Sequence, residues 1–366
     1  MRSIENAKNI SSSPAIRSTA ELARQLGLSR WTVSRVINGH DGVHEDTVKR
    51  VRDAMRDSGF SPNPLAQGLR RGRTNIIGVC VPEIEDFYLG PKLEFLRRTV
   101  SEQGFHLMIG MTDGNPDTEI ETLDHLRLLC VAGIISFASQ LSPRNSAIAR
   151  LQEAKIPLLL VDPMTPGTEC GLGVDRASGM KEATRHLLDL GHRRFATLGF
   201  NSGSVYSCLR LAAIQEVLHS SKPKTKAMLQ HLPLPEGDSL YTAGREAAEA
   251  FRREKGKDLP TAVLTINDRV AMGLIDGLRT LGLRVPEDIS IIGYDNMEAG
   301  AFISPKLTTI DPSPDALMAQ TATRLLRLIR NEGDSPDFPF RSPSRLIVRE
   351  STCKHPASLS RVRRST

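Results

Sequence analysis

The side chains best equipped for chemistry in this sequence lie between Arg30 and Ile37. Val33, Val36 and Ile37 recur there at helical spacing, so the residues between them fall on the opposite face of a predicted helix. That outer face carries guanidinium, indole and hydroxyl groups, contributed by Arg30, Trp31, Ser34 and Arg35. Such groups can pair with the edges of DNA bases, above all guanidinium with guanine. The stretch therefore predicts a surface that reads DNA.

A second predicted helix must hold this surface in place. Ser18 and Glu21 have the S-x-x-E spacing of a capping box, so a helix should begin at Thr19 and end before Gly27. Its apolar face comprises Leu22, Ala23 and Leu26. Ser29 can cap the helix that follows. Two short helices joined by a glycine turn form a helix-turn-helix, whose second helix enters the major groove. An ordinary helix pair with a solvated basic face has the same spacing.

The wider run STAELARQLGLSRWTVSRVING resembles the N-terminus of the LacI/GalR family of bacterial transcriptional regulators, whose pattern is roughly T-x-x-D-V-A-x-x-A-G-V-S-x-x-T-V-S-R-V-x-N. Matching positions are Ala23, Gly27, Ser29, Thr32, Val33, Ser34, Arg35, Val36 and Asn38. The departures are Ser18, Glu21, Leu22, Leu26 and Leu28, all small changes in a packed helix pair. The resemblance extends to about Arg349. It implies that Ser29, Thr32 and Asn38 join the four outer residues at the DNA.

Length, cysteines and hydropathy restrict the class of protein. The 366 residues suit two or three domains. No run of about 18 apolar residues occurs and no apolar segment follows the N-terminal charges, which predicts a cytoplasmic protein without membrane contact. The five cysteines are scattered and never in C-x-x-C spacing. They predict reduced thiols and neither a disulfide framework nor a metal site.

The charge of the chain is concentrated at its N-terminal end. Residues 1–73 hold 13 Lys and Arg against 7 Asp and Glu, a net of +6, while the remaining residues hold 35 of each. A basic domain on a neutral body favours phosphate contacts made by that domain. A solvated basic helix face would have the same composition.

A third helix, from His44 to Ser58, carries Val48, Val51 and Met55 at helical spacing and should close a small core before Gly59 stops it. The segment that follows resembles the family's hinge, which becomes helical on operator DNA and inserts a leucine into the minor groove. Leu69 matches that leucine, and Asn63 and Ala66 match the flanking positions. An apolar wedge between base steps unstacks and bends the duplex.

From Thr74 onward, short apolar runs rich in β-branched residues alternate with helix-length segments, which predicts an α/β fold with doubly wound parallel sheets. The runs are IIGVCVP, FHLMIGM, AGIISFA, IPLLLVD, FATLGF, TAVLTIND and DISIIGYD. The family resemblance implies two such sheets in two lobes, the fold of periplasmic sugar-binding proteins. The crossover back resembles the family's P-x-L-T-T-I stretch in SPKLTTIDP.

The predicted organisation is an arm expected to be disordered over 1–17, an all-α helix-turn-helix domain over 18–60, a hinge over 61–73, a two-lobed domain over 74–353 and a basic disordered tail over 354–366. The first lobe should comprise about 74–173 and about 300–330, and the second about 174–297 and about 331–350. TATRLLRLI has the period of one helix and no leucine heptads follow it, so a tetramerising coiled coil is not expected.

By the resemblance, an effector binds between the lobes at the carboxyl ends of the strands. Asp162 and Asp268 stand at predicted strand ends, where carboxylates can accept from hydroxyls or amines. Arg210 matches the arginine of the family's R-x-x-G-F motif, although Ala213 and Ile214 replace its glycine and phenylalanine. The other predicted ligand contacts are Phe87 and Tyr88, a stacking surface at the cleft mouth, and Ser239, which replaces an aromatic residue of the relatives. A surface salt bridge or a core aromatic is the alternative for each.

Catalytic motifs are incomplete. The stretch that starts at Gly171 has only the first two glycines of a dinucleotide-binding fingerprint. The S-x-x-K motif at Ser178 is not followed by the S-D-N and K-T-G motifs that accompany it in β-lactamase-like enzymes. No P-loop, metal-ligand cluster or cofactor site is predicted. The sequence therefore predicts a homodimeric repressor that binds a pseudo-palindromic operator and responds to a sugar, a sugar derivative or a nucleobase-like effector. The alternatives are a sugar-binding receptor without a role at DNA and an enzyme on a doubly wound sheet.

Overall fold

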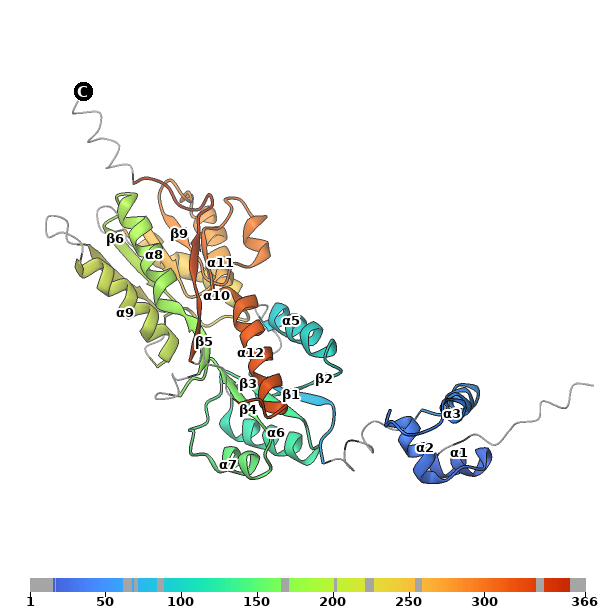
Figure 1. Cartoon of the computed structure of the whole chain (residues 1–366). Coiled ribbons are helices and arrows are strands. Elements are labelled where there is room, and N and C mark those ends of the chain that lie inside the picture. Colours follow the sequence, from blue (N-terminus) through green and yellow to red (C-terminus); the bar gives the residue numbers. More distant parts are fainter. Residues whose placement is uncertain are drawn as a thin grey trace, which may run out of the picture. The chain divides into compact units, whose positions relative to one another are not determined.

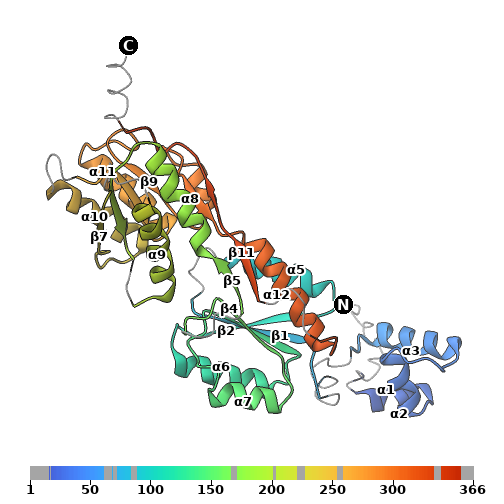
Figure 2. The same ribbon diagram turned by 60° about the vertical axis from the view of Figure 1, so that its left-hand side comes forward.

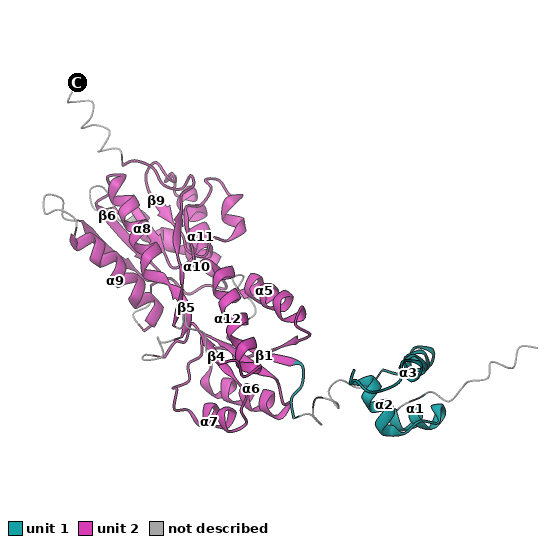
Figure 3. Ribbon diagram, viewed as in Figure 1, with its two compact units in different colours: residues 1–75 teal, residues 76–366 magenta. Residues whose placement is uncertain are grey.

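The computed structural model describes two compact units, Met1–Asn75 and Ile76–Thr366 (Figure 3). The described residues are 16, 18–61, 68, 72–83, 89–165, 171–200, 203–220, 227–253, 259–333 and 339–355. Most of the predicted arm and tail, residues 1–15, 17 and 356–366, lie outside them.

The first unit is built from α1 (Thr19–Leu26), α2 (Arg30–Ile37) and α3 (Glu45–Ser58), shown in blue in Figure 1. Their apolar faces share one core, as the helical spacing predicted. Its buried residues are Ile16, Leu22, Ala23, Val33, Val36 and Val51. Ile16 precedes α1, so the core begins inside the predicted arm of residues 1–17.

Local hydrogen bonds set the ends of the first two helices. The Ser18 hydroxyl accepts the N–H of Glu21 at 3.2 Å, and the Ser29 hydroxyl accepts the N–H of Thr32 at 2.9 Å. Gly27 ends α1 in the left-handed region at φ 63°, a conformation that glycine adopts without a steric cost. The predicted caps and the predicted glycine turn are confirmed.

The second unit begins with a six-stranded sheet in the order β11-β5-β4-β3-β1-β2, whose strands all run parallel. The strands are β1 (Ile76–Val81), β2 (His106–Met111), β3 (Gly133–Phe137), β4 (Leu158–Val161), β5 (Leu172–Asp175) and β11 (Phe340–Pro343). The helices of this lobe are α5 (Leu89–Ser101), α6 (Pro116–Leu128), α7 (Ser146–Glu153) and α12 (Pro314–Ile329) (Figures 1 and 2). Ile77 and Val79 of β1 pack toward α5 and α12, whereas Ile76 and Cys80 pack toward α6 and α7. The alternation buries both faces of the sheet, as expected for parallel strands.

The second lobe contains a four-stranded parallel sheet in the order β7-β6-β8-β9. Its strands are β6 (Arg194–Leu198), β7 (Met228–Leu232), β8 (Ala262–Thr265) and β9 (Ser290–Ile292). Its helices are α8 (Arg176–Asp189), α9 (Val205–Ser220), α10 (Leu240–Arg253), α11 (Asp268–Thr280) and the short 3-10 helix η2 (Glu298–Ala301). Phe195 of β6 packs toward α8 and α9, and Leu198 packs toward α10 and α11. The predicted two-sheet α/β fold is confirmed.

The described chain crosses between the lobes after β5, after β10 (Thr309–Asp311) and after β11. These crossings differ from the predicted lobe boundaries near residues 300 and 331. Residues up to Asp311 stay with the second lobe, because β10 pairs with β12 (Arg345–Ile347) and Ile310 belongs to its core. β11 returns to the first sheet and pairs with β5, where it covers an otherwise open edge.

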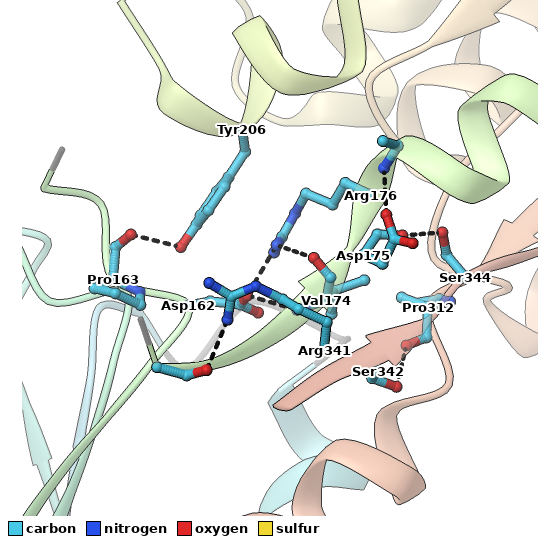
Figure 4. A network of polar contacts seen from close by, with 12 residues as sticks. Asp162, Pro163, Val174, Asp175, Arg176, Tyr206, Pro312, Arg341, Ser342 and Ser344 are labelled. Carbon is cyan, nitrogen blue, oxygen red and sulfur yellow. Dashed lines mark hydrogen bonds and ion pairs between the residues drawn. The ribbon is translucent and has the colours of Figure 1, made fainter. Parts of the chain in front are cut away.

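Serine hydroxyls tie these crossings together (Figure 4). The Ser344 hydroxyl accepts the N–H of Gly179 at 3.0 Å, and the Ser178 hydroxyl donates to the Ser344 carbonyl at 3.1 Å. A Cβ on Gly179 would lie 2.6 Å from Ile310, so only glycine fits where α8 passes β10. Ser178, the first residue of the S-x-x-K motif, therefore has a structural position at the crossing.

Cys80, Cys130, Cys208 and Cys353 are free thiols. Within the described ranges, no helix has the length and apolar character needed to cross a membrane. The same part of the chain contains no group of three or more His, Cys, Asp or Glu residues arranged to hold a metal ion.

Candidate functional site

The outer face of α2 presents the first candidate site. Trp31 is 65% exposed, and Arg30 and Ser34 are also exposed, while Val33 and Val36 are buried on the opposite side. The helix therefore separates a core face from a face that carries an indole, a guanidinium and a hydroxyl. These groups can contact base edges once the helix lies in a major groove.

Arg35 does not point outward with them. Its guanidinium donates to the carbonyl of Asp41 and lies over the ring of Trp31, 4.8 Å from the ring centre. The chain turns through Gly39 and Gly42, both at positive φ, and this turn brings the Asp41 carbonyl within reach. In this structure Arg35 fixes the loop after α2 and supports one face of the indole.

The remaining polar residues form hydrogen bonds at the two ends of α2. The hydroxyls of Ser29 and Thr32 are 2.8 Å apart, and the Asn38 amide donates to the carbonyl of Ser34 at 2.7 Å. Asn63, Ala66 and Leu69, which the sequence places at the minor groove, lie outside the described residues. Their DNA contacts stay predictions.

The second candidate site is a cavity of about 320 Å³ inside the second unit, between its two lobes. Phe137 and Asp162 enter it from the carboxyl ends of β3 and β4, and Ile266 and Asn267 enter it after β8. Ligands of open parallel sheets bind at this edge. A second cavity of about 500 Å³ adjoins it and shares Asp295.

Asp162 lies in the cavity wall and holds an arginine there (Figure 4), while its contact with a ligand stays a prediction. Its Oδ1 accepts from Nη1 of Arg176 at 2.8 Å and from the N–H of Val174 at 3.0 Å. Burial by itself would raise the pKa of Asp162, but the charge and hydrogen bond of Arg176 outweigh it, so the pKa is lowered. The carboxylate is therefore ionised and already paired.

Two guanidinium groups lie in the cavity, each on the face of a tyrosine ring. Arg176 lies 3.8 Å from the ring centre of Tyr206, and Arg210 lies 3.7 Å from that of Tyr294. The Tyr206 hydroxyl donates across the lobes to the carbonyl of Pro163 at 3.0 Å (Figure 4). Arg210 thus lies in the cavity wall, and its contact with a ligand stays a prediction. Each ring restricts its guanidinium to one plane.

Asp268 is not among the residues that line the cavity, in contrast to the sequence prediction. Its Oδ2 accepts the N–H of Met297 at 2.7 Å and its Oδ1 accepts the hydroxyl of Thr309 at 2.5 Å. Asn267 caps α11 by accepting the N–H of Val270, so Asp268 becomes the first helical residue and turns inward. Burial raises the pKa of Asp268 to about 8.

Ser239 also lies away from the cavity, because it is exposed and its hydroxyl accepts the N–H of Thr242 at 3.2 Å at the start of α10. Phe87 and Tyr88 lie outside the described residues, so their stacking role stays a prediction.

The cavity also contains residues that sequence reasoning missed, namely Lys92, Arg176, Tyr206 and Tyr294. A signal for Arg176 was present, because Asp175 follows a short apolar run and can cap the next helix, which places Arg176 at the carboxyl end of a strand. The run LGV is too short to predict β5 from its composition. Nothing in the sequence indicates that Lys92 lines the cavity, since a lysine in a helix is normally exposed.

Comparison with known proteins bears on both sites. Residues 19–63 match the family described as bacterial regulatory proteins, lacI family, and residues 184–352 match the periplasmic binding protein-like domain. The chain is 28% identical over 342 residues to catabolite control protein A of Priestia megaterium, covering 91% of this chain and 98% of the relative.

A second relative is the HTH-type transcriptional repressor PurR of Aliivibrio salmonicida, which is 31% identical over 312 residues, or 84% of this chain and 90% of the relative. Among solved structures, the lac repressor dimer bound to operator and the anti-inducer ONPF is similar, with a TM-score of 0.77 and 25% identity. That similarity covers 92% of this chain and 99% of the other.

Proposed function

Because the chain belongs to the lacI family of bacterial regulatory proteins, we propose that it is a ligand-responsive repressor that binds a pseudo-palindromic operator as a homodimer in the cytoplasm. The observation that carries the proposal is the outward face of α2, where Arg30 and Trp31 project from a capped and closed helix pair. A receptor of the periplasmic type has no use for such a face.

Arg30 and Trp31 read the half-site in this proposal. Arg30 stands at the N-terminal end of α2, where a recognition helix touches bases, and its guanidinium can donate to both acceptors of a guanine. Trp31 offers an apolar surface for a thymine methyl and one N–H donor. Because Arg35 supports one face of the indole, only the other face and the edge are free to meet DNA.

The dimer forms, in this proposal, through β2. This strand is the outer strand of the first sheet, and its side chains Met108, Ile109 and Met111 are exposed. An exposed apolar edge strand favours association, and a two-fold operator requires a two-fold protein. The lac repressor, which is similar along 92% of this chain, is a dimer on its operator. A second copy of the chain is therefore the occupant we assign to this edge.

The effector binds in the interlobe cavity, where Arg210 and Asp162 lie among the lining residues. The volume of about 320 Å³ is at the small end of the range of roughly 300–1,000 Å³ for ligand sites, which fits a ligand of monosaccharide or nucleobase size. Asp268 lies outside this lining, and its oxygens hold Thr309 of β10 and Met297, which lines the adjoining second cavity.

Ligand binding acts on DNA binding through the angle between the lobes. The contacts from Tyr206 to Pro163 and from Arg176 to Asp162 join the two lobes across the cavity. A ligand that touches both lobes stabilises one angle over the others and so shifts the population of DNA-competent dimers. The coupling is reciprocal, so operator DNA changes the affinity for the effector by the same factor.

The proposal is tested by selecting duplexes from a random pool with the full-length protein and measuring affinity for the selected sequence over a range of salt. We expect an inverted repeat, bound by a dimer, with log affinity falling linearly with log salt concentration. Arg30→Ala should relax the preference at one base pair per half-site, by about 1–3 kcal/mol. Selection of no sequence, or binding that salt leaves unchanged, would contradict the function.

A further inference from the structure

The guanidinium groups of Arg176 and Arg210 in the cavity each have N–H donors that no acceptor of the described residues satisfies. Nη1 of Arg210 donates to the carbonyl of Ile266 at 2.8 Å, and Nη1 of Arg176 donates to Asp162. Both Nε atoms are buried and have no hydrogen-bond partner, and the described residues supply none to either Nη2. The hydroxyl of Tyr294 is buried without a partner as well. Donors left in this way are rare in folded proteins.

The charge of Arg210 also lacks an ion pair within the described residues. Arg210 is 8% exposed, and no carboxylate of the described chain forms an ion pair with it. Burial lowers the pKa of Arg210 and the positive charge of Arg176 lowers it further, and these effects outweigh the opposing influence of Tyr294, Asp295 and Asp162. Two like charges held close together in a buried site destabilise the ligand-free protein. A site of this kind is typical of function, since a ligand of opposite charge removes the penalty.

A third cation enters from the other lobe. Lys92 of α5 is 7% exposed, lines the cavity and lies with its ammonium 5.6 Å from the ring centre of Phe137. The acids that line the cavity are Glu83, Asp162 and Asp295, and the cations are Lys92, Arg176, Arg210 and Arg269. Asp162 forms its ion pair with Arg176, and no ion pair to Arg210 is formed within the described residues.

We propose that the effector carries an anionic group, a carboxylate or a phosphate, which binds between Arg176 and Arg210 with Lys92 facing it from the opposite lobe. This inference rests on the proposed function, because it names the class of ligand for the same cavity. The Nε and Nη2 atoms of a guanidinium are parallel donors that match two oxygens of one anionic group.

The inference is tested by thermal unfolding of the full-length protein at one ionic strength, with sodium chloride as the reference salt. The probes are inorganic phosphate, glucuronate, glucose 6-phosphate and neutral glucose. A probe at ten times its Kd shifts the folding equilibrium about elevenfold. We expect anionic probes to raise the unfolding temperature and glucose to leave it unchanged. Glucuronate and glucose 6-phosphate separate a carboxylate site from a phosphate site, and a response to either supports the inference.

Arg210→Met supplies the decisive variant. It removes a buried charge that forms no ion pair within the described residues, so the ligand-free variant should unfold at the same or a higher temperature, while the response to anionic probes disappears. An arginine that served only the fold would lower the unfolding temperature when removed. Arg185→Met, the same change at an exposed position on α8, should keep the full response. If Arg210→Met fails to fold, Arg210→Lys replaces it and should weaken anion binding at least tenfold.

Three results would overturn the inference: no anionic probe acts beyond chloride, glucose acts as strongly as glucuronate, or the response persists without Arg210. Operator binding is measured on the same preparations. If operator binding succeeds and the anions fail, only the ligand class is wrong. If operator binding fails, the proposed function is wrong whatever the anions do.

Discussion

The buried carboxyl of Asp268 predicts a stability that falls as pH rises. Its side chain is fully buried, and burial raises its pKa from the ordinary 3.8 to about 8. Between these values the folded state keeps a proton that the unfolded state has released. Stability from this group is therefore complete below about pH 4 and is lost progressively up to about pH 8.

The magnitude follows from linkage. One pH unit in this interval changes the free energy of unfolding by about 1.4 kcal/mol, so the change between pH 5 and 7 is about 3 kcal/mol. Asp268→Asn has the shape of the protonated carboxyl and does not titrate. We expect the variant to be close to the parent at pH 5 and more stable than it by about 3 kcal/mol at pH 7.

The assay is urea unfolding of parent and variant at pH 5, 6, 7 and 8, with the difference between them plotted against pH. Groups that titrate in both proteins cancel in this difference, including His192, whose pKa burial lowers to about 4. Asp288→Asn is the control, because Arg284 lowers the pKa of Asp288 and the variant should be the less stable protein at pH 7. A difference for Asp268→Asn that stays constant from pH 5 to 7 would refute the reasoning.

Other perturbations test the DNA-binding and dimer surfaces. Ile109→Asp should convert the dimer to a monomer in analytical ultracentrifugation, because it places a charge on the apolar edge of β2, whereas Leu209→Asp on α9, at the same 45% exposure, should remain a dimer. Arg35→Ala should lower the fluorescence anisotropy of Trp31, the chain's single tryptophan, and weaken operator binding about tenfold, by about 1.4 kcal/mol; unchanged anisotropy would count against the stacking. Leu69→Ala should weaken specific binding and DNA bending but not non-specific binding, and equal losses on both kinds of DNA would exclude a wedge.

The helix pair could be read from the sequence because its signals are local. The capping serines, the glycine turn and the apolar positions of the two eight-residue helices are all short-range signals, and the structure has each of them where the spacing placed it. Arg35 is the exception, since its contact with Asp41 depends on a loop whose path spacing does not reveal.

The two sheets were predictable from their apolar runs, but several strands were not. β1, β3 and β8 are buried throughout, so their sequences are continuous apolar runs. β11 reads FRSP and has neither an apolar run nor alternation, because it pairs at the edge of the sheet through its backbone. Its place, and with it the lobe boundary, follows from a pairing with β5 some 170 residues earlier, which short-range patterns do not report.

The cavity residues show the same limit more sharply. Asp162 and Asp268 both follow strands and looked equivalent in sequence, yet one lines the cavity and the other is buried behind it. The difference is one residue in the start of a helix, because Asn267 takes the capping position and turns Asp268 inward. The geometry of the helix cap therefore decides whether the aspartate side chain faces the cavity or the protein interior. Residue type alone does not determine that geometry.

The position of Arg176 connects the ligand site to the crossing between the lobes. Asp175 caps α8 through its carboxylate and its carbonyl accepts from the Ser344 hydroxyl, so Arg176 follows directly on the point where the chain leaves the first lobe. Its guanidinium holds Asp162 of the first lobe and lies on Tyr206 of the second. In the proposed complex, an anion bound at Arg176 would compete with Asp162 for the same positive charge and so weaken a contact that joins the lobes. Ligand occupancy and the interlobe angle would then both depend on the Arg176 side chain. No chain of further residues would be needed to connect them.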